Sequence, residues 1–391
     1  MITAKDAIQL VLSESKPLGA NKIHLNKALG YYLFEAVFSP INMPPFRQSA
    51  MDGYALNLHE DTNYNLIDEV KAGDSHSPKL KQGEAIRIFT GAAVPDTANA
   101  VIMQERVIIN GETITLNGDV KLNDNIRPLG EQVKKGAVAL DKGTLLTPAA
   151  IGFLASLGIT EISVYIKPSI AIVVTGNELA EPGTNLPYGK IYESNAIMLQ
   201  SALNSLGHHN VSIHKVEDDY QSTYVMLNDV ITSNDMVLVS GGISVGDYDF
   251  VGKALLELQV EQVFYKVKQK PGKPLFFGKK GNSTIFALPG NPAAALSCFY
   301  IYINLALQKM SGIKHVELLK SQLISASNHI KKGDRAQFLK ASVSNDEVTV
   351  LEGQSSAMLQ TFAVANALVY ISEDGGNISI GDTVEVIHLP K

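Results

Sequence analysis

Side chains that could bind phosphate and metal follow several short apolar runs in the second half of the sequence. The clearest case is the segment LVSGGISVGDYDF (238–250), where an apolar run stops at Ser240 and glycines and two aspartates follow. Glycines let backbone N–H groups approach an anion, and carboxylates are hard oxygen ligands of the kind that Mg²⁺ prefers. The segment is therefore either a phosphate cradle beside a metal site or only a turn between a strand and a helix.

Four other apolar runs end in a similar way. The segments that follow them are TGNE (175–178), EDD (217–219), KQKPGKP (268–274) and PGNP (289–292). In an open parallel sheet, ligands bind outside the carboxyl ends of the strands, so these segments would meet at one edge. Together the segments predict a site for a phosphorylated substrate that is bridged by a divalent metal.

Individual residues of this site can be named from their chemistry. The glycine-rich segment and three lysines are expected to hold an oxyanion, through Gly241, Gly242, Ser244, Gly246, Lys266, Lys270 and Lys273. Five acids are candidate metal ligands, namely Glu178, Asp218, Asp219, Asp247 and Asp249.

These assignments have structural alternatives. Asp218 and Asp219 could instead cap a helix that begins at Tyr220. At least one of the lysines at the strand end is expected to serve only solubility. Pro289 and Pro292 could simply bracket a helix start.

Other reactive residue types carry little signal. Cys298 lies among apolar residues of an expected helix and is assigned to the core. The histidines show no metal-binding spacing, and His208 and His209 are expected at an exposed helix end. The sequence therefore offers no credible protein nucleophile.

Strands and helices alternate between residues 168 and 319. The run IAIVV (170–174) is apolar and mostly β-branched, as a parallel strand that is covered on both faces must be. Further strands are expected at 211–216, 236–239, 262–267, 275–277 and 284–288, and helices at 194–206, 220–231, 251–258 and 292–310. The alternation predicts a central α/β domain with a parallel sheet and helices on both faces.

The flanking regions are β-rich. Short β-like runs alternate with turns before residue 140, including a predicted strand over 100–109 and a hairpin at Asn110-Gly111. At the N-terminus, Thr3 begins a capping box before a helix that Pro17 ends. The expected parts are an N-terminal helix (1–19) packed on the α/β domain, a linking domain (20–41 plus 140–167), a β-rich domain (42–139), the α/β domain (168–319) and a small C-terminal β-barrel (320–391).

Composition limits the class of protein. The 391 residues are 45% apolar with a net charge of -6, which argues against a nucleic-acid carrier with a broad basic face. A single cysteine excludes a disulfide framework and a multi-cysteine zinc site. The N-terminus lacks a signal-peptide pattern, and no apolar run approaches the ~20 residues of a membrane helix. We therefore expect a cytoplasmic multidomain protein with no nucleic-acid or membrane partner.

Six motifs carry a family resemblance. They are SAMDGYA (49–55), FTGAAVP (89–95), TGNEL (175–179), SGGISVGDYD (240–249), KPGKP (270–274) and LPGNP (288–292). In this order and spacing they resemble the molybdopterin molybdenumtransferase family, which includes bacterial MoeA and the E domain of gephyrin. The resemblance covers the chain from about residue 4 to its end.

The resemblance implies an enzyme that inserts molybdate into adenylylated molybdopterin, releasing AMP and molybdenum cofactor with the help of Mg²⁺. It also implies a homodimer in which Asp52 and Thr90 would complete the partner's site. Molybdopterin adenylyltransferase and proteins that mature molybdoenzymes would be further partners. Positions that match the family's functional residues are Glu178, Asp218 or Asp219, Asp249, Lys266, Lys270, Lys273, Pro289 and Pro292. Ser356 falls near the family's C-terminal serine contact.

The chain departs from the family pattern at three positions. Ala294 stands where many relatives have serine, and Lys340 stands where arginine is expected. Both positions belong to the molybdate subsite in the family interpretation. Lysine keeps the charge but loses the bidentate geometry of arginine. Asn177 replaces an aspartate, although the neighbouring Glu178 remains.

Three competing functions remain open from the sequence. The adenylyltransferase of the preceding step shares the α/β fold but should not need the flanking β-rich domains. A non-catalytic molybdopterin-binding carrier or scaffold paralogue is favoured by the departures at Ala294 and Lys340. A paralogue that inserts tungstate is not distinguishable, because tungstate and molybdate have nearly the same size and charge.

Overall fold

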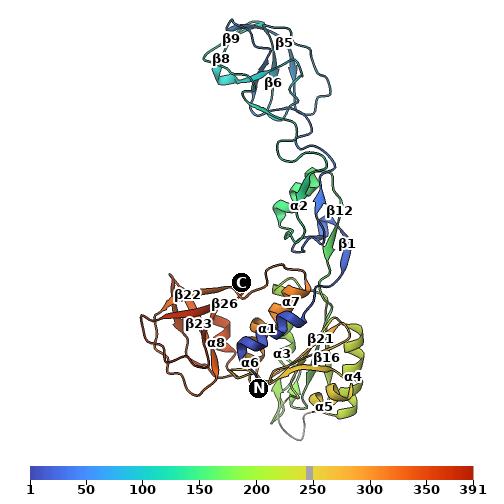
Figure 1. Cartoon of the computed structure of the whole chain (residues 1–391), viewed down its shortest axis with the longest axis vertical. Helices are drawn as coiled ribbons and strands as arrows, with labels where there is room; N and C mark the ends of the chain where they lie inside the picture. Colours follow the sequence, from blue (N-terminus) through green and yellow to red (C-terminus); the bar gives the residue numbers. More distant parts are fainter. Residues whose placement is uncertain (244–249, 391) are drawn as a thin grey trace. The chain divides into compact units, whose positions relative to one another are not determined.

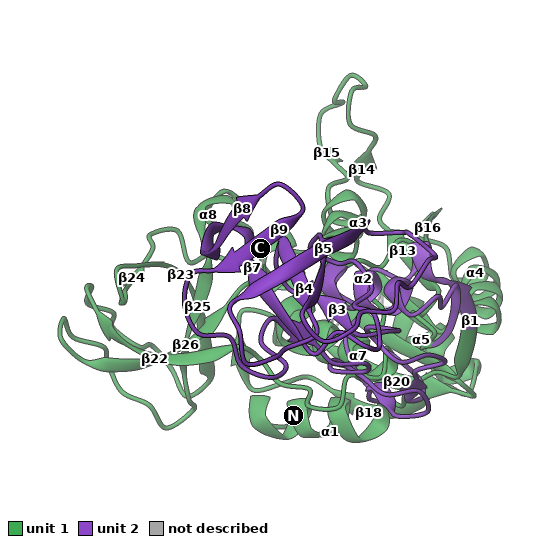
Figure 2. Ribbon diagram, turned by 90° about the horizontal axis from the view of Figure 1, so that it is seen from above, with its two compact units in different colours: residues 1–21, 30–32, 164–391 green, residues 22–29, 33–163 purple. Residues whose placement is uncertain are grey.

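The computed structural model describes residues 1–243 and 250–390. It divides into two compact units, which Figure 1 and Figure 2 show. Unit 1 comprises residues 1–21, 30–32 and 164–391, and unit 2 comprises residues 22–29 and 33–163. The finer division into five domains stays a prediction. Within the described ranges, no helix has the length and apolarity that crossing a membrane requires.

A six-stranded sheet with the order β16-β13-β17-β21-β20-β18 forms the centre of unit 1. Its strands are β13 (Ile170–Thr175), β16 (Val211–Val216), β17 (Met236–Ser240), β18 (Glu261–Tyr265), β20 (Phe276–Lys280) and β21 (Ser283–Leu288). β13 lies parallel to β16 and β17, and β17 lies parallel to β21, which confirms the predicted parallel core. β20 is antiparallel to both of its neighbours, contrary to the prediction. The turn at 281–282 explains this difference, because so short a connection can only reverse the chain.

Helices cover both faces of this sheet, as predicted (Figure 1). One face carries α1 (Ala4–Glu14), α3 (Asn195–Ser205), α6 (Pro292–Cys298) and α7 (Asn304–Met310), and the other carries α4 (Tyr220–Ser233) and α5 (Phe250–Glu257). Alternate side chains of β13 enter the two cores, Ile172 on the first face and Val173 on the second. The uninterrupted apolar run of β13 follows from this two-sided burial.

Two local features of these helices bear on the predictions. α1 begins with the predicted cap, because the Asp6 N–H donates to Thr3 Oγ1 at 3.1 Å. The predicted helix over 292–310 is a single helical stretch, in which a π-helical segment (Phe299–Ile303) separates α6 from α7.

The C-terminal part of unit 1 is a closed β-barrel, as predicted. Its strands are β22 (Lys320–Ser325), β23 (Ala336–Ser344), β24 (Glu347–Val350), β25 (Ala367–Ile371) and β26 (Thr383–His388), and α8 (Gln360–Val364) lies between β24 and β25 in the sequence. The ring runs β23-β24-β22-β26-β25 and closes through pairing of β25 with β23. β19 (Gln269–Lys270) pairs with β23 and so joins the predicted basic loop to the barrel.

Unit 2 is β-rich, as predicted, and its main sheet has the order β7-β4-β6-β5-β9-β8. The strands are β4 (Gly53–Leu56), β5 (Asn63–Val70), β6 (Glu84–Ile88), β7 (Ala100–Met103), β8 (Val107–Asn110) and β9 (Thr113–Leu116). The hairpin of β8 and β9 is confirmed, but its turn is Gly111-Glu112, because Asn110 pairs with Thr113. The predicted strand over 100–109 is split by a 3₁₀ turn, η2 (Gln104–Arg106). β5 was not predicted, since most of its side chains are exposed.

The remaining elements are short. They are β1 (Ala20–His24), η1 (Leu25–Lys27), β2 (Val37–Phe38), β3 (Gln48–Ser49), β10 (Ile126–Arg127), β11 (Val138–Leu140), α2 (Pro148–Ser156), β12 (Glu161–Tyr165), β14 (Leu179–Ala180) and β15 (Ile191–Tyr192). They form two-stranded sheets in the pairs β1 with β12, β2 with β11, β3 with β10 and β14 with β15.

The chain after α3 corrects one prediction. His208 is only 6% exposed, whereas both histidines of this segment were expected at the surface. Its burial, together with the nearby Lys167 ammonium, lowers the pKa of His208 to about 4. His209 is exposed, as predicted.

Candidate functional site

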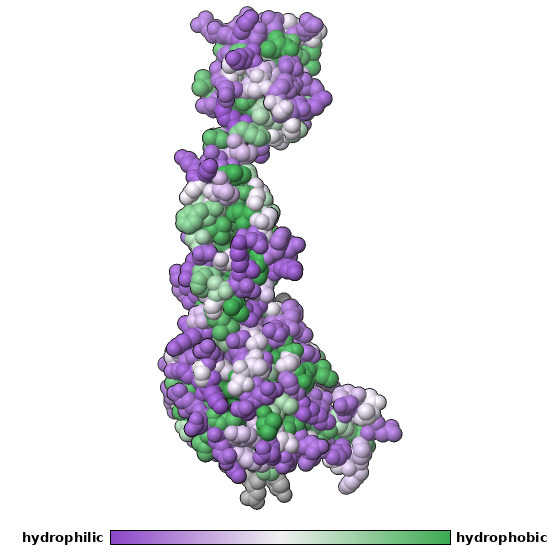
Figure 3. Space-filling model, turned by 90° about the vertical axis from the view of Figure 1, so that its right-hand side faces the viewer, coloured by the Kyte–Doolittle hydropathy of each residue, from purple (hydrophilic) through white to green (hydrophobic). Residues whose placement is uncertain are grey.

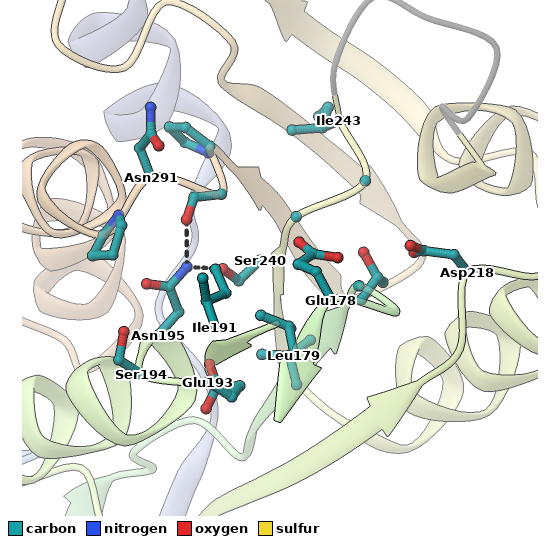
Figure 4. A pocket seen from close by; sticks show the side chains of 18 of the residues that line it. Glu178, Leu179, Ile191, Glu193, Ser194, Asn195, Asp218, Ser240, Ile243 and Asn291 are labelled. Atoms are coloured by element: carbon teal, nitrogen blue, oxygen red, sulfur yellow. Dashed lines mark hydrogen bonds between the residues drawn. The ribbon is translucent and has the colours of Figure 1, made fainter. Parts of the chain in front are cut away.

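A cavity of about 750 Å³ lies at the carboxyl ends of β13, β17 and β21 in unit 1, and Figure 4 shows it from close by. This is the edge at which the sequence places the site. The predicted site residues that line the cavity are Glu178, Asp218, Gly241, Gly242, Pro289 and Pro292. Ser244, Gly246, Asp247 and Asp249 lie outside the described residues.

Two carboxylates project from the loops after β13 and β16 (Figure 4). The Glu178 carboxylate packs over the Gly176 backbone, where a Cβ atom would lie 2.7 Å from Glu178 Oε2. Asp218 is fixed by reciprocal bonds, since the Asn177 N–H donates to Asp218 Oδ2 at 3.0 Å and the Asp218 N–H donates to Asn177 Oδ1 at 3.2 Å. The amide at position 177 thus joins the two loops. Neither carboxylate forms an ion pair with a described residue.

The glycines after β17 pack against β13. Gly241 and Gly242 have φ values of +93° and +64°, which side chains rarely adopt. A Cβ atom at Gly241 would lie 2.7 Å from the Thr175 carbonyl oxygen, and one at Gly242 would lie 2.9 Å from Thr175 Oγ1. Both positions therefore require glycine, and the backbone that they expose lines the cavity.

Asn195, at the start of α3, forms another wall. Its side-chain amide donates to Ser240 Oγ at 2.7 Å and to the Gly290 carbonyl at 2.8 Å (Figure 4). A carbonyl can only accept, so the amide nitrogen must face Gly290 and the orientation of the side chain is fixed. Asn195 Oδ1 is buried and accepts no hydrogen bond from a described residue. Asn195 therefore joins the end of β17 at Ser240 to the turn at Gly290 and fixes this part of the cavity wall.

The turn that begins α6 faces this wall. Pro289 and Pro292 line the cavity, and Pro292 is also the first residue of α6. The structural interpretation of Pro292 is therefore confirmed, and its functional role stays a prediction. Asn291 donates through Nδ2 to Ser356 Oγ at 2.9 Å, and the Ser356 carbonyl accepts from the Ala294 N–H at 3.2 Å. The segment after Ser356 contributes Ala357 to the lining.

The three lysines of the predicted oxyanion site do not line the cavity. Lys270 and Lys273 are exposed on a loop whose Gly272 has φ +83°. A Cβ atom at Gly272 would lie 2.5 Å from Cys298 Sγ, so this loop packs tightly on α6. Lys266 lies over the ring of Tyr265, with its ammonium 4.6 Å from the ring centroid.

Buried side chains under this basic loop fix its backbone. Gln269 donates to the Gly272 carbonyl at 3.2 Å and accepts a hydrogen bond from the Tyr302 hydroxyl. Cys298 is fully buried beside them, which confirms its assignment to the core. Burial raises the pKa of the Cys298 thiol to about 12, so it is not a nucleophile near neutral pH. Lys268 forms an ion pair with Asp334 at 2.9 Å.

Asp219 takes the predicted alternative of a helix cap, whereas the contacts of Lys340 differ from those of an oxyanion ligand. Asp219 caps α4, because the Ser222 N–H donates to its Oδ2 at 2.7 Å, and this bond lowers the pKa of Asp219. Lys340 is only 3% exposed, and its ammonium donates to three backbone carbonyls. In the chain outside 244–249, no group of three or more potential metal-ligating side chains is present.

Asp52 and Thr90 lie in unit 2 and contact each other. Asp52 Oδ1 accepts from the Thr90 N–H at 2.7 Å and from the Thr90 hydroxyl at 2.8 Å. These bonds lower the pKa of Asp52, which therefore stays ionised at neutral pH. The motifs SAMDGYA and FTGAAVP, far apart in the sequence, thus meet in one ordered pair of loops.

Some residues that line the cavity lie outside the predicted site segments, among them Glu193 and Asn195. Glu193 is buried and accepts from the Ala196 N–H at 2.9 Å, so it caps the first turn of α3. The available signal is the polar triplet Glu193-Ser194-Asn195 at the start of the helix expected over 194–206.

Comparisons with known proteins cover both units. Family models match at residues 2–158 (MoeA N-terminal region, domains I and II), 171–309 (probable molybdopterin binding domain) and 322–389 (MoeA C-terminal region, domain IV). A molybdopterin molybdenumtransferase of Haemophilus influenzae is 34% identical over 99% of this chain and 98% of its own length. One from Staphylococcus aureus strain Mu50 is 30% identical over 99% of this chain and 95% of its own. A crystal structure of a molybdopterin biosynthesis moeA protein from Pyrococcus horikoshii matches with a TM-score of 0.85 at 30% identity, covering 100% of both chains.

Proposed function

The chain belongs to the molybdopterin molybdenumtransferase family, and from this premise we propose that it transfers molybdenum from molybdate to adenylylated molybdopterin, with release of AMP. Membership of this family makes the chain a transferase of molybdenum cofactor biosynthesis. The identity of the two substrates and the release of AMP are the proposed part.

One observation carries the proposal. The cavity at the ends of β13, β17 and β21 falls in the segment that matches the molybdopterin-binding model, and carboxylates and bare glycine backbone line it together. Gly241 and Gly242 expose backbone on which a phosphate can be held close to the chain. No lysine or arginine is found among its described lining residues, so the negative charge of a pyrophosphate needs a partner from elsewhere.

The donor set of the cavity fits Mg²⁺ as that partner. Glu178 and Asp218 present carboxylate oxygens that no described lysine or arginine neutralises, and such hard ligands suit this ion. We propose that these two residues hold the metal, with Asp247 and Asp249 as further candidates. Asp219 ranks behind Asp218, because its carboxylate already caps α4. Bound Mg²⁺ would offset the charge that develops on the leaving AMP phosphate.

The chain's own groups have separate tasks in this mechanism. Asn195 fixes the cavity wall by joining Ser240 to the Gly290 carbonyl, and the turn at Pro289 and Pro292 shapes the same wall. Lys270 and Lys273 extend from a rigid loop as point charges for an oxyanion. No protein nucleophile takes part in this proposal. When molybdenum joins the two dithiolene sulfurs, one oxygen of molybdate leaves as water with the two thiol protons. Water then breaks the anhydride bond, so that AMP leaves and the pterin keeps its own phosphate.

A homodimer with shared sites belongs to the same proposal. Its support is the ordered pair of Asp52 and Thr90, which brings together the two motifs of unit 2 that the resemblance assigns to a shared site. In addition, unit 2 exposes large apolar side chains at Phe38 (59%) and Val138 (45%), which are paired in register across β2 and β11. Figure 3 shows apolar surface beside polar surface on the viewed face of this unit. Apolar surface of this kind favours association.

Location and partner proteins follow from the proposed reaction. A cofactor intermediate with two free sulfurs requires a reducing compartment, and the single cysteine is buried as a free thiol, so we place the protein in the cytoplasm. Molybdopterin adenylyltransferase, which would supply the adenylylated substrate, and proteins that mature molybdoenzymes are the proposed contacts.

The test measures AMP release from adenylylated molybdopterin with Mg²⁺, with and without molybdate. We expect release that depends on molybdate and yields transferable cofactor. Glu178→Gln and Asp218→Asn should lower the rate on the order of 10- to 100-fold, with part of the loss recovered at high Mg²⁺. Asp229→Asn, at an exposed position of α4, is the matched control and should match the parent chain.

Other outcomes would redirect the assignment. Tight binding of the adenylylated pterin with no release under any condition would favour a non-catalytic carrier or scaffold. Release with tungstate but not with molybdate would favour a tungstate-inserting paralogue. Equal rates in Glu178→Gln and the parent chain, at every Mg²⁺ concentration, would remove Glu178 from the metal site.

A further inference from the structure

Lys340 lies in β23, and its environment is unusual for a lysine. The side chain is 3% exposed. Its Nζ donates to the carbonyl oxygens of Gly353 at 2.7 Å, Ser355 at 3.2 Å and Met358 at 3.0 Å. A lysine ammonium has three N–H groups and no acceptor, so these three bonds use its whole capacity. No N–H group remains for an oxyanion.

The three carbonyls belong to one loop that reaches the cavity. Ser355 and Met358 flank Ser356 and Ala357, and Ala357 lines the cavity wall. Ser356 joins the loop to the turn that begins α6, through its hydroxyl to Asn291 and through its carbonyl to the Ala294 N–H. The position of the cavity wall at Ala357 therefore depends on the contacts that the loop makes with β23, on the side away from the cavity.

A second contact holds the same loop to β23. Gln354 Oε1 accepts from the Lys340 N–H at 3.0 Å, and Gln354 Nε2 donates to the Lys340 carbonyl at 2.9 Å. Both the backbone and the ammonium group of Lys340 thus hold the loop against β23.

We propose that Lys340 is a positioning residue, which holds the loop 353–358 against β23 and thereby sets the cavity wall at Ala357, and that it does not bind molybdate. This inference rests on the proposed function, because it assigns the wall to the site of the adenylylated pterin. The oxyanion must then be held by other groups, such as the exposed ammonium groups of Lys270 and Lys273.

The proposal makes arginine a poor substitute at this position. The three carbonyls converge on a single nitrogen, whereas a guanidinium spreads its N–H groups over a plane of three nitrogens. Lys340→Arg keeps the charge, so it separates the two roles. An oxyanion ligand would tolerate this change, and a three-carbonyl clamp would not.

The test compares Lys340→Arg, Lys340→Met and Gln354→Leu with the parent chain, and uses the exposed barrel lysine variant Lys320→Met as the matched control. Hydrogen exchange of peptides that cover 351–362 is measured without substrate. The apparent KM for adenylylated molybdopterin and for molybdate is measured separately, well below the unfolding temperature of each variant.

We expect all three test variants to speed exchange in 351–362 and to raise the apparent KM for the pterin about tenfold, because buried carbonyls lose their donors or the clamp loosens. The KM for molybdate should stay within about twofold of the parent value in each, since no ligand of the oxyanion is removed. A loss of stability alone would not produce this split between the two substrates.

The reverse pattern would overturn the proposal. In that pattern Lys340→Arg exchanges like the parent chain, and Lys340→Met raises the KM for molybdate alone. If both Lys340 variants fail to fold, Gln354→Leu tests the positioning role by itself, because it loosens the loop without changing any charge. An unchanged KM for the pterin in Gln354→Leu refutes that role. If the parent chain releases no AMP, the proposed function is refuted. Hydrogen exchange tests the loop independently of that outcome: if residues 351–362 exchange at the parent rate in the folded variants, the role of Lys340 in holding the loop is refuted.

Discussion

Replacing Gly272 by alanine should destabilise unit 1 through two separable effects. Gly272 has φ +83°, and an alanine in this left-handed region costs about 1–2 kcal/mol. Its Cβ atom would also lie 2.5 Å from Cys298 Sγ in a core that has no room to yield. Overpacking of this kind adds about 1–3 kcal/mol. The expected loss is therefore about 2–5 kcal/mol, the sum of the two effects.

Gly281 supplies the control that separates these effects. It has φ +59°, and a Cβ atom there would meet nothing within 4 Å. Gly281→Ala should therefore cost only the backbone part, about 1–2 kcal/mol. The double variant Gly272→Ala/Cys298→Ala is compared with Cys298→Ala alone. In it most of the steric part should disappear, since the nearest remaining contact of the Cβ atom is 3.0 Å to Gln269 Nε2, and the backbone part should remain.

The assay is native-state hydrogen exchange of β17 and β21. A chain of two units need not unfold in a single transition, so a whole-molecule melting temperature would mix them. Core strands exchange only when their own unit opens, and their exchange therefore reports the unfolding free energy of unit 1. If Gly272→Ala is no more destabilising than Gly281→Ala, the tight contact between the basic loop and α6 is refuted.

Three further predictions follow from the described contacts. His208 must be neutral in the folded state because burial lowers its pKa to about 4, while the unfolded chain binds a proton near pH 6.5. The unfolding free energy of unit 1 should thus fall by about 1.5 kcal/mol as the pH falls from 6.5 to 5. Hydrogen exchange should show this loss in His209→Gln and not in His208→Gln. Asp52→Asn should speed exchange of the Thr90 amide, whose acceptor it weakens. Asn195→Asp places an oxygen against the Gly290 carbonyl and should weaken pterin binding about tenfold in a direct titration.

Much of the fold could be predicted because it depends on local patterns. The apolar runs of β13, β17 and β21 predicted strands that are buried on both faces, and the structure places them side by side and parallel. Once the sheet is parallel, the segments after these strands must meet at one edge, so Glu178, Asp218 and the first two glycines could be placed at the cavity.

The sequence could not predict whether a given polar side chain lines the cavity or forms a structural hydrogen bond. Asp218 and Asp219 are neighbours of one type, yet the first lines the cavity and the second caps α4. The conformation of the turn between β16 and α4 determines which of the two carboxylates faces the cavity, and the sequence pattern does not specify that conformation. Likewise, β20 runs antiparallel because of a turn whose length the sequence analysis did not weigh.

The sequence by itself determined most of the elements, the parallel strands of the central sheet, the C-terminal barrel, the family and the edge that carries the site. Periodicity, caps, turn residues and motif order are properties of neighbouring residues, so they can be found without the fold. Only the tertiary structure decided which charged side chains still have hydrogen-bonding capacity for a ligand and which ionisable side chain is kept neutral. The acceptors that use up the Lys340 ammonium stand 13, 15 and 18 residues away, and the burial that keeps His208 neutral comes from packed segments that no local pattern specifies. Hydrogen-bond capacity and burial depend on which distant residues arrive at a side chain, and these are properties of the folded chain.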